Sequence, residues 1–487
     1  MGMVAFIFKT NLNEKNSNSY LMFLTLVATL GGLLFGYDTA VISGTVKYLE
    51  INFVDPLGLD ETAASSLLGF AVSSALIGCV IGGMIGGFMA TRLGRKRSLM
   101  IAAVLFVLSA IGSAYPEMGF PAGQPHEFIV CFVVYRIIGG VGVGLASMLS
   151  PMYIAEMAPA EKRGGLISWN QFAIIFGMLV VYFVNYTIAL SGDEAWLTHT
   201  GWRLMFLSEV VPAMLLLILI FCVPESPRWL VMKGRIEKAE TILKRVDPRR
   251  DTQAEVESIR ESLQGVVKAK LFSCGVAVIV IGILLSVFQQ FVGINVVLYY
   301  APEIFRNMGM GTNAALMQTI IVGVINLSFT TLAIFTVDRF GRRPLMIIGS
   351  LGMMVSMITL GFTFYTERMG LLSLLSMLTY TASFAVSWGP VCWVLLAEIF
   401  PNKIRGQAMA LAVAAQWCAN YLVSWTFPMM DKSTYLTETF HHGFAYWIYA
   451  LMALLSALFM YKFVPETKGK SLEQMESLFE KRNTSGK

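Results

Sequence analysis

Twelve charge-poor runs, each long enough to cross a bilayer as a helix, dominate this sequence. They are centred near residues 32, 77, 106, 142, 177, 212, 287, 326, 354, 385, 418 and 452. A spanning helix needs about 20 apolar residues, because the backbone must satisfy its own hydrogen bonds in lipid. Only 14% of the residues are charged, against about 25% in soluble domains. The sequence therefore predicts an all-α membrane protein with twelve transmembrane helices.

The basic residues are distributed unevenly between the connections. If the N-terminus is cytoplasmic, alternate connections and both tails hold all but six of the 36 Lys and Arg residues. Cytoplasmic loops carry such an excess of Lys and Arg, so we expect both termini in the cytoplasm. The net charge of +5 follows from this topology and does not indicate a nucleic-acid partner. The six exceptions are Lys47, Arg136, Arg203, Arg306, Arg368 and Lys432.

Three short motifs occur twice, in the same order and at nearly one period. They are Arg92-x-Gly94-Arg95-Lys96 with Arg339-x-Gly341-Arg342-Arg343, Ala155-Glu156-x-x-Pro159-x-x-x-Arg163-Gly164 with Ala397-Glu398-x-x-Pro401-x-x-x-Arg405-Gly406, and Pro224-Glu225-Ser226 with Pro465-Glu466-Thr467. The chain is therefore interpreted as an internal duplication. Transporters use this arrangement to build a midplane site between two bundles.

The longest polar stretch separates the sixth apolar run from the seventh. Within it Ile236, Ala239, Ile242 and Leu243 recur at helical spacing, which predicts short amphipathic helices beneath the bundles. We expect five parts: a cytoplasmic tail at 1–19, a six-helix bundle at 20–223, a cytoplasmic helical linker at 224–270, a second six-helix bundle at 271–464 and a cytoplasmic tail at 465–487.

Motifs for bond-making chemistry are missing from the sequence. It has no metal-ligand spacing of Cys and His, no nucleophile elbow and no P-loop. The run Gly139-Gly140-x-Gly142-x-Gly144 lacks the spacing and strand context of a nucleotide loop. Like Gly78, Gly82 and Gly86, which lie four residues apart, these glycines are expected to pack helices closely. The chain is not expected to be an enzyme or to need a cofactor or a metal.

Asp38 and Arg136 are charged residues inside apolar runs, the first and the fourth. A carboxylate at this depth costs about 2.5–3.5 kcal/mol and usually faces a cavity or a partner. A pair that opened and closed would let the carboxyl group release and take up a proton. Two interpretations stay open, a purely structural ion pair and a coupled proton site.

Several amides lie near the centres of apolar runs. Amides in spanning helices often only join helices, at about 0.6 kcal/mol each. A sugar, however, needs several amide partners for its hydroxyls and an aromatic wall, which these residues and nearby Trp side chains could supply. A helix break at Gly293 would bring residues 289 and 295 to one cavity, and Gly389-Pro390 offers a second kink. The residues are Gln171, Gln289, Gln290, Asn295, Asn326, Gln416 and Asn420, with Trp388, Trp393 and Trp417.

The basic loop motifs, Pro-Glu-Ser-Pro-Arg at 224–228 and Pro-Glu-Thr-Lys-Gly at 465–469 resemble those of the major facilitator superfamily, specifically its sugar porters. The segments 31–44, 288–295 and 387–393 are most similar to bacterial D-xylose:proton symporters. The resemblance implies the major facilitator fold. It also implies a monomeric symporter in the inner membrane that imports a monosaccharide, expected to be D-xylose, with one proton by alternating access.

The resemblance also implies roles for individual residues. Asp38 would be the protonation site, Arg136 its partner and Glu209 a member of the relay. The sugar contacts would be Gln171, Gln289, Gln290, Asn295, Trp393 and Gln416, with Phe35, Tyr299, Gly389 and Trp417 completing the wall. One position departs from the pattern: Met178 stands where a further amide is expected. The missing hydrogen bond is worth about 0.5–1.5 kcal/mol, which would weaken pentose binding or shift the sugar preference.

Ion pairs on the cytoplasmic side are expected to latch the two bundles when the site faces outward. The resemblance assigns them to Arg92, Glu156, Arg163, Glu225 and Arg228 in the first half and to Arg339, Glu398 and Arg405 in the second. The first copy departs from the family pattern at Thr91, where the second copy has Asp338.

Three other functions remain open at this level. The chain could be a facilitator in which Asp38 is only structural, or a proton symporter for glucose, galactose or arabinose. It could also be a transport-inactive sugar sensor, which long regulatory tails would favour.

Overall fold

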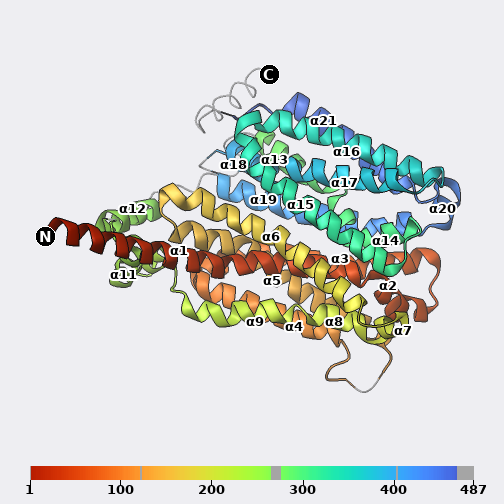
Figure 1. Cartoon of the computed structure of the whole chain (residues 1–487), viewed down its shortest axis with the longest axis horizontal. Coiled ribbons are helices and arrows are strands. Elements are labelled where there is room, and N and C mark those ends of the chain that lie inside the picture. The colour runs from red at the N-terminus through yellow and green to blue at the C-terminus, as the bar shows by residue number, and fades with distance from the viewer. Residues whose placement is uncertain (1, 121–122, 250, 265–275, 402–403, 469–487) are drawn as a thin grey trace.

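The computed structural model describes residues 2–120, 123–249, 251–264, 276–401 and 404–468, without the side chains of residues 2–16, 160, 263, 264 and 338. Two bundles of long helices lie side by side (Figure 1). The first bundle comprises α1 (Gly2–Val41), α3 (Glu61–Arg92), α4 (Arg95–Ala114), α5 (Ile129–Met157), α6 (Ala160–Ala189), α8 (Trp202–Leu207) and α9 (Val210–Leu219), with the short α2 (Val46–Leu49) and α7 (Glu194–Trp196) at one end. The second comprises α13 (Val276–Phe291), α14 (Ile294–Asn307), α15 (Thr312–Phe340), α16 (Arg342–Tyr365), α17 (Leu371–Val386), α18 (Trp388–Ile399), α19 (Arg405–Asp431) and α21 (Phe444–Phe463), with the short α20 (Thr434–Phe440).

Eleven spans in the described residues are long and apolar enough to cross a membrane. The twelfth expected run, centred near residue 418, forms α19, whose 27 residues include the buried polar side chains of Gln416 and Asn420. These amides make α19 less apolar than the other spans. The prediction of an all-α, multi-pass membrane protein with two six-helix bundles is confirmed.

The polar linker folds into α10 (Pro227–Met232), α11 (Ile236–Val246) and α12 (Thr252–Gln264). Ala239 and Leu243, two of the residues predicted at helical spacing, are buried against Trp229, Leu230 and Val256. The predicted amphipathic helices are therefore present. The end of the molecule that carries α11, α12 and the turns at Gly94 and Gly341 is called the linker end below, and the opposite end, with α2, α7 and α20, the far end (Figure 1).

Two spans of the second bundle are interrupted. The break between α13 and α14 lies at Gly293, as predicted, where φ is +93° and a Cβ atom would lie 2.7 Å from the ring of Tyr449. The break between α17 and α18 lies at Ser387, two residues before the predicted kink at Gly389-Pro390. A proline ring clashes with the carbonyl group four residues earlier, which places the distortion next to Val386.

The contacts between the bundles include backbone as well as side chains. On α3, a Cβ atom at Gly69 would lie 2.2 Å from the carbonyl oxygen of Trp425 on α19, and the indole of Trp425 donates to the carbonyl of Ser66 at 3.1 Å. The Tyr182 hydroxyl donates to the Leu298 carbonyl at 3.0 Å. The two halves are therefore closely packed along α3–α19 and α6–α15, and one hydrogen bond joins α6 to α14.

Polar contacts join the two halves at the far end. Lys432 pairs with Glu50, the hydroxyl of Thr434 donates to Glu61, and the hydroxyl of Thr312 donates to Glu194. No ion pair between described residues joins the two halves at the linker end. The structure is thus closed at the far end.

Prediction for helix packing. A Cβ atom at Gly78 of α3 would lie 2.0 Å from the carbonyl oxygen of Ile137 on α5, whereas Gly83 on the same helix has open space. Gly78→Ala is expected to lower stability by about 1–3 kcal/mol, because overpacking forces the helices apart. Gly83→Ala, the matched control, is expected to be neutral or stabilising, because alanine favours helix. Thermal unfolding of the purified variants measures both, and equal melting temperatures would contradict the packing role.

Candidate functional site

A fully buried ion pair joins α1 to α5 in the first bundle. Arg136 Nη1 lies 2.9 Å from Asp38 Oδ1, and Nη2 donates to the Asp38 carbonyl oxygen at 3.2 Å. The side chains are 1% and 0% exposed. The guanidinium also lies over the ring of Phe206, 5.5 Å from its centroid. Arg136 thus holds both the backbone and the carboxylate of residue 38.

Glu209 is a second carboxyl group in the same cluster. It is 0% exposed, no described group donates a hydrogen bond to its oxygens, and it lies close enough to Asp38 to bond it when one of the two carboxyl groups carries a proton. The neighbouring Ser208 hydroxyl bonds the Tyr37 hydroxyl at 2.8 Å, which holds this turn against α1. Two ionised carboxylates with one guanidinium would leave an uncompensated buried charge. The cluster is neutral when one carboxyl group carries a proton.

The candidate amides of the second half gather around the two helix breaks. Gln289 Nε2 donates to the carbonyl of Trp388 at 2.9 Å and to that of Gly389 at 3.3 Å, while its buried Oε1 has no partner. Asn295 Nδ2 donates to Gln290 Oε1 at 2.5 Å across Gly293. The break therefore brings Asn295 to Gln290, and Gln289 binds the second break.

The remaining candidate wall residues come from both halves. The ring centroids of Phe35 on α1 and Trp417 on α19 are 5.6 Å apart. Gln416 is buried with its Oε1 unpartnered, and Tyr299 is buried near Asn420. Gln171, Trp393 and Gly389 are half-buried, and Met178 is buried beside Gly36. In the described part of the chain, no hydrogen bond or ring contact joins Gln171 or Trp393 to the other candidates.

The linker end carries two copies of one ion-pair network. In the first half Arg95 pairs with Glu156 at 2.7 Å, and Glu225 accepts from the backbone N–H of Arg95 and Lys96. In the second half Arg342 pairs with Glu398 at 2.8 Å, and Glu466 accepts from the backbone N–H of Arg342 and Arg343. Each network lies within one half of the chain.

Glycine is required at the turn of each copy. Gly94 and Gly341 have φ of +97° and +90°, and Cβ atoms there would lie 2.2 Å from Glu225 and 2.9 Å from Glu466. The positive φ and the close carboxylate both exclude a side chain. The turn directs the first backbone N–H groups of α4 and α16 toward these carboxylates. The N-terminus of a helix is a favourable place for negative charge.

The basic partners differ from those expected from the sequence. Arg92 lies over the ring of Phe88, Arg405 Nε donates to the carbonyl of Phe400, and Arg163, Arg228 and Arg339 are exposed. None of these five pairs with a described carboxylate within 4 Å. The partners that sequence analysis missed are Arg95, Arg342 and Glu466. The repeated motifs contain all three, so the signal was available.

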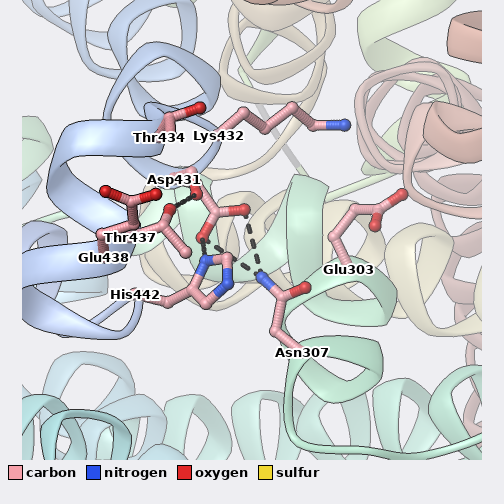
Figure 2. A pocket seen from close by; sticks show the side chains of 8 residues that line it. All are labelled: Glu303, Asn307, Asp431, Lys432, Thr434, Thr437, Glu438 and His442. Atoms are coloured by element: carbon pink, nitrogen blue, oxygen red, sulfur yellow. Dashed lines mark hydrogen bonds and ion pairs between the residues drawn. The ribbon is translucent and has the colours of Figure 1, made fainter.

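A cavity of about 370 Å³ lies at the far end of the second bundle (Figure 2). Asp431 Oδ1 there bonds His442 Nδ1 at 3.0 Å, and Asn307 donates to Asp431 Oδ2 at 3.1 Å. The bond to Asp431 raises the pKa of His442. The pair therefore stabilises this end at low pH and loses strength as the pH rises through the raised value. None of the proposed sugar contacts lines this cavity.

Comparisons with known proteins agree with this geometry. The family described as "Sugar (and other) transporter" matches residues 24–479. The D-xylose-proton symporter of Escherichia coli K12 is 62% identical over 479 residues, which cover 96% of this chain and 98% of that protein. The glucose facilitated diffusion protein of Zymomonas mobilis is 42% identical and covers 96% and 99% of the two chains. The arabinose-proton symporter of Bacillus subtilis is 40% identical, covering 96% and 97%.

Solved structures match over nearly the whole fold. The inward open conformation of the xylose transporter XylE from E. coli matches with a TM-score of 0.86 at 60% identity, covering 94% of this chain and 100% of that one. XylE bound to 6-bromo-6-deoxy-D-glucose matches with a TM-score of 0.81 at 62% identity, covering 95% and 100%. The chain belongs to the family of sugar (and other) transporters.

Proposed function

We propose that this protein is a proton-coupled symporter that imports a monosaccharide, D-xylose, by alternating access. The observation that carries the proposal is the Asp38–Arg136 pair, fully buried in the first bundle beside the equally buried carboxyl group of Glu209. The strong similarity to a D-xylose-proton symporter supports both the proton and the sugar. The positive charge of the linker end supports a cytoplasmic location for it. We propose a monomer in the inner membrane, with the bundles at residues 20–223 and 271–464.

Helix α1 connects the proton cluster to the sugar wall. Phe35 and Asp38 lie three residues apart on it, Phe35 against Trp417 of the other half and Asp38 against Arg136 of its own. A movement of α1 that follows sugar binding at the Phe35 side would change the distance between Asp38 and Arg136. The carboxylate keeps its charge beside the guanidinium and takes a proton when the two separate. This is the proposed coupling step.

The sugar site is proposed between the two halves at the helix breaks. Gln289, Gln290 and Asn295 offer amide groups beside the break at Gly293, and Gln416 and Gln171 add two more. Trp393, Trp417, Phe35, Tyr299 and Gly389 would form its wall. The unpartnered oxygens of Gln289 and Gln416 support this assignment, because a buried carbonyl oxygen needs a donor and a sugar hydroxyl provides one.

Latching ion pairs are proposed at the linker end. The carboxylates of Glu156, Glu225 and Glu398 now bind Arg95 and Arg342 of their own half. The exposed Arg163, Arg228 and Arg339, together with Arg92 and Arg405, would then be available for contacts across the halves when the linker end closes. The closed far end of this structure supports an inward-facing state in which that latch is open.

Proton coupling provides a definite driving force. One proton moved across 100 mV supplies about 2.3 kcal/mol, enough for roughly fifty-fold accumulation. The leading alternative is a facilitator, which the 42% identity to a glucose facilitated diffusion protein favours. A symporter for arabinose or a hexose is the second alternative, in line with the arabinose-proton symporter among the relatives.

Prediction for the proton site. Asp38→Asn is expected to abolish uphill sugar accumulation in energised vesicles while sugar binding and exchange remain, because the amide cannot carry the proton. Asp55→Asn, at an exposed far-end carboxylate, is the matched control and should accumulate sugar normally. Radiolabelled uptake with an imposed proton gradient measures both. Full accumulation by Asp38→Asn would refute the assignment, and no accumulation by the unaltered protein would favour the facilitator.

Prediction for the sugar site. Gln289→Ala should weaken sugar binding at least tenfold, about 1.4 kcal/mol, since it removes hydrogen bonds and frees two carbonyl groups at the α17–α18 break. Gln253→Ala, an exposed amide in α12, should leave binding unchanged. Calorimetric titration of the purified proteins with D-xylose gives the affinities. A dissociation constant equal to that of the unaltered protein would remove Gln289 from the site.

Prediction for sugar preference. Met178→Gln is expected to strengthen D-xylose binding several-fold, because the amide adds about one hydrogen bond at a position now filled by an apolar side chain. Met178→Leu is the control of similar volume and should bind as the unaltered protein does. A competition panel of pentoses and hexoses measures the change. An unaltered ranking in Met178→Gln would show that this position does not contact the sugar.

A further inference from the structure

Three buried oxygens without partners follow one another on one side of α4 and the turn after it. They belong to Ser109, Ser113 and Glu117, which are four residues apart. The two serines are 1% and 0% exposed. Residues at this spacing stack along one helix face, although the turn at Glu117 lies beyond the last residue of the helix. Other buried hydroxyls of the described chain instead bond a carbonyl group of their own helix, as Ser74 does to Ala71 at 2.8 Å.

The inner end of this column meets the proton cluster. A Cβ atom on Gly139 would lie 2.3 Å from Ser109 Oγ and 3.1 Å from Asp38 Oδ1, so the two oxygens are close neighbours. Helices α4 and α5 run antiparallel. About one turn further along α4, a Cβ atom on Gly112 would lie 2.2 Å from the ring of Tyr135 on α5. Arg136 therefore lies at the level between Ser109 and Ser113, and its Nε has no partner.

The outer end of the column reaches the surface at the far end. Glu117 Oε1 pairs with Arg203 at 2.8 Å, and the side chains are 31% and 14% exposed. Arg203 also donates to the carbonyl of Ala114 at 2.6 Å and lies over the rings of Trp202 and Tyr115. The exposed fraction of the side chain thus rises along the column from Ser113 to Glu117.

The column is enclosed within the first half. Helix α4 packs mainly against α5, α8 and α9, all elements of the first bundle. The proposed sugar contacts of the second half lie on α13, α14, α18 and α19. A proton that follows α4 would therefore not pass the sugar.

Water is needed to join the members of the column. Four residues rise about 6 Å along a helix, a gap that one water with two hydrogen bonds of about 2.8 Å spans. Buried hydroxyls without protein partners are the groups that internal water serves in native proteins. Each hydroxyl can then accept one hydrogen bond and donate another.

From these contacts we infer that protons reach Asp38 from the far end along Glu117, Ser113 and Ser109, by a path separate from the sugar. A proton taken up at Glu117 displaces one from each hydroxyl and water in turn, and the last one passes to Asp38. The hydroxyls are unchanged at the end, Glu117 is again an anion, and Asp38, separated from Arg136 as in the proposed coupling step, is a neutral acid. This inference rests on the proposed symport and on a far end that faces outward.

The experiment compares Ser113→Val with Ser113→Thr in proteoliposomes. Valine and threonine have nearly the same shape, so the pair isolates the hydroxyl group. Ser113→Val should slow xylose-driven proton uptake at least tenfold, while sugar affinity and sugar exchange without net proton movement stay within twofold. Ser113→Thr should restore proton uptake. Ser74→Val and Ser74→Thr, at a buried serine bonded to its own helix, are the matched controls and should both transport protons normally.

The readouts separate the possible failures. Proton uptake by Ser113→Val at the rate of the unaltered protein would overturn the path. Equal slowing of proton uptake and sugar exchange would show a structural role for Ser113 and would also overturn it. If the unaltered protein takes up sugar without protons, the proposed symport itself fails, and the path with it.

Discussion

The Asp38–Arg136 contact is the interaction on which the interior of the first bundle depends. Neither charge could be left alone there, because a buried ion without its partner costs about 3–5 kcal/mol. Arg136 meets this requirement by binding both the carboxylate and the backbone carbonyl of residue 38. Helices α1 and α5 are thereby fixed in register. The glycines of α5 also let this helix pack closely against α3, since a Cβ atom at Gly140 would lie 1.8 Å from the carbonyl oxygen of Ala75.

The duplication is expressed most clearly at the linker end. Each half places a glycine with positive φ before a helix, an arginine against one glutamate and a second glutamate over the first N–H groups. The two copies are equivalent in contacts and lie within separate halves. The far end has no such symmetry, because its contacts, such as Lys432 with Glu50, join different elements of the two halves.

Much of the fold followed from the sequence, because lipid permits few solutions. Apolar length predicted the spans, and Gly293 predicted one break. The other break lies at Ser387 and not at the predicted Gly389-Pro390. The ring of Pro390 clashes with the carbonyl group four residues earlier, so the helix is distorted before the proline. The buried charges were identifiable from their apolar surroundings. The choice of Arg95 over Arg92 and of Arg342 over Arg339 was not predicted, since it depends on the direction each helix takes after its turn. Contacts between halves depend on the conformational state, which one sequence does not specify.

The fully buried carboxyl groups, Asp38 and Glu209, both lie in the first half of the described chain. Most amides proposed to face the sugar lie in the second. Substitutions in the second repeat can therefore alter proposed sugar contacts without disturbing the buried charges of the first, whereas Gln171 and Met178 lie in the same half as those charges. The proposed energy coupling and most of the proposed sugar selectivity would then belong to different repeats.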